Sequence, residues 1–77
     1  MNKELLEKVN ELDKKIEDVK RNISRANSMM DINRNVKISN GDYAVILTNE
    51  QKIMFLSMLQ FQLTEELSKL QVEFEKL

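Results

Sequence analysis

The chain has 77 residues, 13 acidic and 12 basic side chains and a net charge of −1, with no Cys, no His, no Pro and one Gly. So short a chain forms one small domain, and the missing Cys and His exclude disulfides, a structural zinc site, thiol nucleophiles and the commonest general base. We therefore expect a single mostly α (α+β) helix–hairpin–helix domain over residues 1–77, stabilised by helix packing and oligomerisation, without cofactor, metal or enzymatic activity.

Residues 3–27 are predicted to form a long amphipathic helix that starts after an Asn2 N-cap. Its apolar side chains form an unbroken heptad repeat with spacings of four and three residues: Leu5, Val9, Leu12, Ile16, Val19, Ile23, Ala26 and Met30. Pairs of opposite charge four residues apart are expected on the exposed surface: Glu4–Lys8, Glu11–Lys15 and Glu17–Arg21. A helix with so narrow an apolar seam needs a partner helix, from this chain or from another copy.

Residues 27–35 lose the heptad pattern and contain three Asn, one Ser and one Asp, which favour turns, so a loop is predicted there. Residues 36–47 predict a β-hairpin with a type I′ turn at Asn40-Gly41, which would place Ile38 opposite Tyr43. The alternation puts most of the large apolar side chains on one face: Val36, Ile38, Tyr43, Val45 and Leu47. Such a hairpin is marginal alone, so it should lie on the helices or pair with the hairpin of another copy.

A second helix is predicted over residues 49–76, because Thr48 and Gln51 form a capping box at its start. A second heptad seam, with one polar member, is expected to pack antiparallel on the first: Ile53, Leu56, Gln60, Leu63, Leu67, Leu70, Phe74 and Leu77. Between residues 53 and 63, however, eight of eleven residues are large and apolar, more than one face of a helix can hold. The surplus ends at Leu63.

That surplus predicts an oligomer interface formed by Met54, Phe55, Met58, Leu59 and Phe61. Met-rich surfaces also serve as grooves for amphipathic helices of other proteins. We favour self-association into a homodimer or tetramer, because a second copy covers the apolar surface without any outside partner.

The charge is unevenly distributed, since residues 20–47 carry five basic and two acidic side chains, including all three arginines. This cluster suggests an anion-binding site: Arg21, Arg25, Arg34 and Lys37. The alternative, which we favour, is that basic residues complement the C-terminal dipole of the first helix and pair with Asp18, Asp31 and Asp42. The acidic pI of about 5.4 and the short basic stripe argue against duplex nucleic acid as a partner.

The expected function is that of a small homo-oligomeric protein that binds another protein. The excess of Lys over Arg and the eight Asn suit a phage or mobile element, and proteins of this kind often inhibit a host process. The alternative is sequestration of an anionic nucleotide at a basic pocket between subunits. No secretory signal and no apolar run of bilayer length is recognisable, so a cytoplasmic protein without membrane contact is expected.

Overall fold

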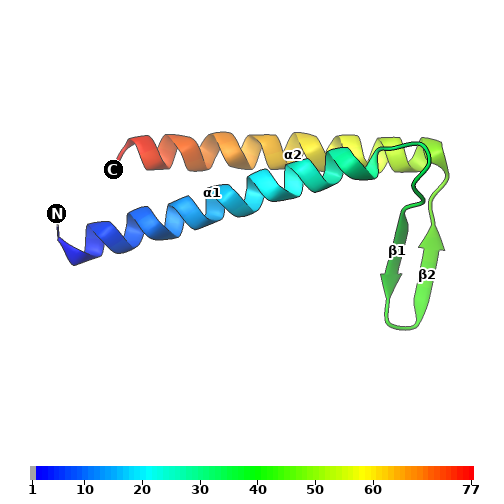
Figure 1. Ribbon diagram of the computed structural model, residues 1–77, viewed down its shortest axis with the longest axis horizontal. Helices are drawn as coiled ribbons and strands as arrows, with labels where there is room; N and C mark the ends of the chain where they lie inside the picture. Colours follow the sequence, from blue (N-terminus) through cyan, green and yellow to red (C-terminus); the bar gives the residue numbers. More distant parts are fainter. Residues whose placement is uncertain (1) are drawn as a thin grey trace.

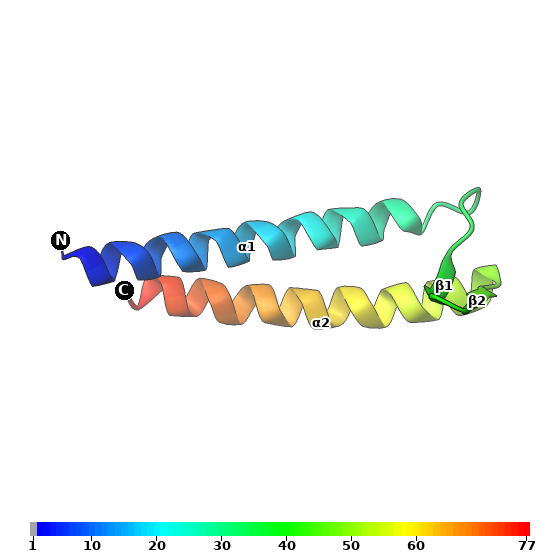
Figure 2. The ribbon, with the colours of Figure 1, turned by 90° about the horizontal axis from the view of Figure 1, so that it is seen from below.

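The computed structural model describes residues 2–77 as two long antiparallel helices joined by a β-hairpin (Figure 1). Helix α1 spans Lys3–Met29, strand β1 Lys37–Asn40, strand β2 Tyr43–Ile46 and helix α2 Asn49–Glu75. The two chain ends lie together at one end of an elongated molecule of 51 × 25 × 16 Å, and the hairpin lies at the other (Figures 1 and 2). The predicted mostly helical helix–hairpin–helix fold is confirmed.

The two helices begin where their capping residues predict. The Asn2 side chain accepts a hydrogen bond from the Leu5 backbone N–H at 2.7 Å. The capping box of α2 is complete, because the Gln51 backbone N–H donates to Thr48 Oγ1 at 3.1 Å and the Thr48 N–H donates to Gln51 Oε1 at 3.0 Å. These bonds satisfy backbone donors that a helix start otherwise leaves unpaired.

Helix α1 continues to Met29, two residues beyond the predicted range, because the heptad repeat itself extends to Met30. Its last turn therefore contains no basic residue, so the predicted dipole role of the nearby arginines is not realised there. Arg21 forms an exposed ion pair with Asp18 at 3.2 Å, one of the predicted acidic partners of the basic cluster, and not with Glu17. An exposed pair of this kind adds at most about 1 kcal/mol to stability.

The seam of α1 is confirmed, since Ile16, Val19 and Ala26 are buried and the other members are half-buried. The seam of α2 is rotated at its start from the prediction. Ile53 is exposed, so its assignment to the seam is wrong, and Lys52 occupies the buried position one turn before Leu56. Lys52 precedes Leu56 by four residues and Ile53 precedes it by three, so either could share a helix face with Leu56. Because Ile53 is apolar, the sequence pattern favoured it over Lys52.

Lys52 is buried because its ammonium group ties the α1–β1 connection to α2. Only 1 % of the residue is exposed, and Nζ donates hydrogen bonds to the carbonyl oxygens of Asp31 at 2.7 Å and Arg34 at 2.9 Å. The turn that presents these carbonyls is held by the Arg34 N–H on Asp31 O and by the Asn33 N–H on Asp31 Oδ1. The apolar stem of Lys52 fills the seam while its charged end pairs with backbone.

The polar member of the seam, Gln60, finds a partner on the facing helix. Its side-chain amide donates a hydrogen bond to Asn27 Oδ1, in the last turns of α1. A single polar pair in a helical seam fixes the register of the helices at some cost in stability.

We expect Gln60→Leu to raise the free energy of unfolding by about 1 kcal/mol and the thermal midpoint by roughly 4–8 °C. Asn27 is exposed and regains water in the variant, while Leu adds apolar burial. Thermal unfolding followed by circular dichroism measures this. The matched change Gln62→Leu, at an exposed position of the same helix, should give no comparable gain. A loss of stability in Gln60→Leu would show that the polar pair stabilises the seam.

The hairpin has the predicted faces in a different register. Ile38 pairs with Val45 and Asn40 with Tyr43, so the two turn residues are Gly41 and Asp42 rather than Asn40 and Gly41. Gly41 has φ +38°, and the residue after it has negative φ, as in a type II′ turn with Gly first. The Asn40 side chain accepts from the Tyr43 N–H at 3.3 Å and helps close this turn. The shift moves each partner by two residues, which preserves the side-chain alternation.

The hairpin projects away from the helices instead of lying on them (Figure 1). Every residue of both strands is exposed, so the predicted packing of the apolar face on the helices is wrong. Only the base of the hairpin is anchored, where the Leu47 N–H donates to Val36 O at 2.9 Å. A small core forms there around Ala26, Val36 and Leu56, with Met30, Leu47 and Leu59 packed against it.

Candidate interaction surfaces

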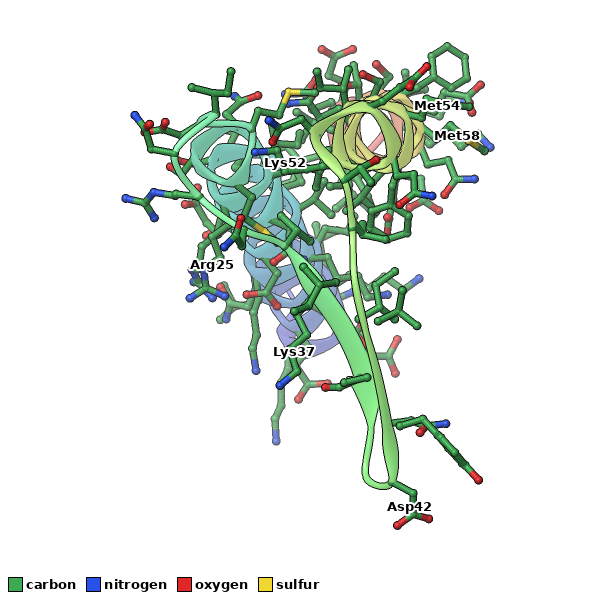
Figure 3. All side chains as sticks on the ribbon, turned by 90° about the vertical axis from the view of Figure 1, so that its right-hand side faces the viewer. Arg25, Lys37, Asp42, Lys52, Met54 and Met58 are labelled. Atoms are coloured by element: carbon green, nitrogen blue, oxygen red, sulfur yellow. The ribbon has the colours of Figure 1, made fainter. Side chains whose placement is uncertain are left out.

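The outer face of α2, defined here as Met54, Met58, Phe61 and Val72, lies opposite the seam with α1. Met54, Met58 and Phe61 are 64 %, 65 % and 67 % exposed, and Val72 is about half exposed. Figure 3 looks along the helices from the hairpin end and shows Met54 and Met58 projecting from α2 on the side away from α1. Since 3.6 residues make one turn, Val72 lies in line with Met54 five turns further on. Nothing in residues 2–77 covers this face.

The five residues predicted as an oligomer interface are therefore only partly brought together. Met54, Met58 and Phe61 share the outer face, and Phe55 is exposed on its flank. Leu59 does not join them, because it is half-buried and packs against the core at the base of the hairpin. Beyond Leu63 the outer face carries the polar residues Glu65 and Ser68 before one more exposed apolar residue, Val72.

The hairpin face, defined here as Ile38, Tyr43 and Val45, is a second exposed apolar surface. Tyr43 is 79 % exposed, and Ile46 is exposed on the reverse side. Within the described chain the sheet has two strands, so each strand has an edge that faces no other strand. Free edges of this kind accept an additional strand from another chain. Sequence alternation identified the apolar face, but nothing local indicated that it would be exposed.

The four residues of the predicted anion site lie on different elements. Arg21 and Arg25 are exposed on α1, Arg34 is in the connecting turn and Lys37 begins β1. Figure 3 shows Arg25 and Lys37 on the side of the molecule away from Met54 and Met58. Arg21 forms an ion pair with Asp18 at 3.2 Å, so one of the four basic groups already has a partner within the protomer. The anion site stays a prediction.

The described part of the chain offers few groups for metal binding or catalysis. Among residues 2–77, no three His, Cys, Asp or Glu side chains gather closely enough to hold a metal ion. The one buried charged residue there, Lys52, has both of its observed bonds to backbone carbonyls and so serves the fold. Neither α1 nor α2 carries an apolar stretch sufficient to cross a bilayer.

Comparisons with protein-family models, with curated proteins and with solved structures yield no match to this chain. The fold is a helical hairpin with a projecting β-hairpin, and its two exposed apolar surfaces are the candidates for a functional site.

Proposed function

We propose that the protein is a non-enzymatic interaction protein that self-associates through the outer face of α2 and binds another protein through its hairpin. The observation that carries this proposal is the presence of two separate apolar surfaces on one small chain: the outer face and the hairpin face. Soluble monomers rarely expose large contiguous apolar patches, and those they do expose usually mark interaction sites.

Self-association suits the outer face because Met54, Met58 and Phe61 follow one another at heptad spacing on a single helix. A second copy supplies an identical stripe, and a two-fold interface buries both at once. The assembly then needs no outside partner to cover Met54, Met58 and Phe61, which are among the most exposed large apolar residues of the described chain.

A different protein suits the hairpin because the strands offer main-chain hydrogen bonds as well as an apolar face. An extended peptide added to a free strand edge gains affinity from backbone bonds and specificity from alternate side chains. The anchored base of the hairpin holds the strands in place, while the tip, marked by Asp42 in Figure 3, stands clear of the helices.

The hairpin assignment is tested by placing a photo-crosslinking amino acid at Tyr43 in cells that naturally express the chain. We expect an adduct heavier than two copies of the 9.1 kDa chain, because the side chain lies on the binding surface. The same amino acid at Lys14, exposed on α1, should not give this adduct. An adduct of two copies only, or none, would overturn the assignment of the hairpin to another protein.

A further inference from the structure

We infer that the occupant of the outer face is the same face of a second copy, with the two α2 helices packed antiparallel. This inference rests on the proposed self-association and adds its geometry. Six residues of the outer side of α2 follow one another at spacings of four, three, four, three and four: Met54, Met58, Phe61, Glu65, Ser68 and Val72. That spacing is a heptad seam on the opposite side of α2 from the seam used by α1.

The seam is asymmetric in size along the helix. Its first half has large side chains, Met54, Met58 and Phe61, and its second half has smaller ones at Ser68 and Val72. The second half is hollowed: Ser68, Lys69, Val72 and Glu73 line one depression, and Ser68 also borders a neighbouring one with Phe61. A face with projections at one end and hollows at the other fits its own copy when that copy runs in the opposite direction.

Antiparallel packing brings a large residue against a smaller one in every layer. Met54 lies against the partner's Val72, Met58 against the partner's Ser68, and Phe61 against the partner's Glu65. The two-fold axis then passes beside residue 63, close to the middle of α2 at residue 62, so the helices overlap along almost all of their 27 residues. At about 1.5 Å per residue this overlap is about 40 Å long.

Charge also favours the antiparallel direction. In a parallel pair Glu65 would face the partner's Glu65 within the seam, and Glu75, the next residue at heptad spacing, would face its own copy as well. Like charges held opposite one another in an interface are unfavourable. In the antiparallel pair Glu65 faces Phe61, and the two flanking residues nearest the axis, Gln62 and Thr64, are uncharged.

The remaining surface agrees with this arrangement. Figure 3 shows that the hairpin leaves the helices in a direction different from that of Met54 and Met58, so it does not obstruct the outer face. Antiparallel packing places the two hairpins at opposite ends of the dimer. They cannot pair with each other within that dimer, and both hairpin faces stay free for another protein.

The chain has no cysteine, so single-cysteine variants report the direction of packing cleanly. We expect tagged Met58→Cys and untagged Ser68→Cys, when mixed and mildly oxidised, to form a mixed disulfide. Neither variant alone should form a dimer disulfide, because equal positions lie about 15 Å apart along the axis and a disulfide requires Cα atoms within about 7 Å. Met54→Cys mixed with Val72→Cys provides an independent second pair.

Each other outcome is decisive. Disulfides between two copies of Met58→Cys, and between two copies of Ser68→Cys, would show parallel packing and overturn the inference while leaving self-association intact. An oligomer that forms no disulfide above the background of Leu6→Cys, an exposed position on α1, would show that the interface lies elsewhere. A wild-type monomer by light scattering would overturn both the inference and the proposed self-association.

Discussion

Lys52→Met should lower the stability of the protein by about 2–3 kcal/mol, or the thermal midpoint by roughly 8–20 °C at fixed protein concentration. Methionine keeps the length and apolar stem of the side chain and removes only the ammonium group. The Asp31 carbonyl oxygen keeps the Arg34 N–H as a donor, whereas the Arg34 carbonyl oxygen loses its donor at 2.9 Å. Hydrogen bonds from a charged donor are among the stronger ones, and their loss outweighs the gain from no longer burying a charge.

The matched control is Lys14→Met, which makes the same chemical change at an exposed position of α1. It should alter stability by no more than about 0.5 kcal/mol. Urea unfolding at one protomer concentration compares the three proteins. If Lys52→Met were as stable as Lys14→Met, the ammonium group would contribute nothing net and water would have to satisfy the Arg34 carbonyl group.

Met58→Glu should raise the dissociation constant of self-association by at least about 100-fold, equivalent to about 2.8 kcal/mol, without unfolding the protomer. The two-fold interface places the new carboxylate in two symmetry-related layers, where each carboxylate must lose its water on association. In the isolated protomer Met58 is 65 % exposed, so the substitution there meets only solvent. Light scattering across micromolar concentrations should therefore show an oligomer for the wild type and a 9.1 kDa monomer for the variant.

Leu6→Glu is the control for this result, since Leu6 is also a large exposed apolar residue but lies on α1. It should keep the wild-type mass, and circular dichroism should show the same helix content in all three proteins. Dissociation by Leu6→Glu with retention of the oligomer by Met58→Glu would move the interface from α2 to α1.

Periodicity and capping chemistry in the sequence were sufficient for the helices and their pairing. The α1 heptad repeat, the Asn2 cap and the Thr48–Gln51 capping box depend on neighbours within one or two turns, and all are present in the structure. The predicted faces of the hairpin are correct although the predicted turn is not, because a register shift of two residues leaves every side chain on its original face.

The candidate surfaces were predicted less completely, because exposure depends on where distant elements lie. Surplus apolar residues on α2 indicated an outer face, but Leu59 packs inward against the core instead of joining it. The hairpin face was identified by pattern, whereas its projection into solvent was not. The four basic residues are close in sequence, yet they lie on three different parts of the fold: α1, the connecting turn and β1.

By itself, then, the sequence determined the two helices, their antiparallel pairing, the hairpin and an excess of apolar surface, since each follows from local spacing. Only the tertiary structure decided which way α2 turns about its axis. The carbonyl groups of the Asp31–Arg34 turn require donors at the end of the helical pair, and Lys52 supplies them from the seam. That requirement excludes Ile53 from the seam and sets Met54, Met58 and Phe61 on the side away from α1, where a second copy can reach them.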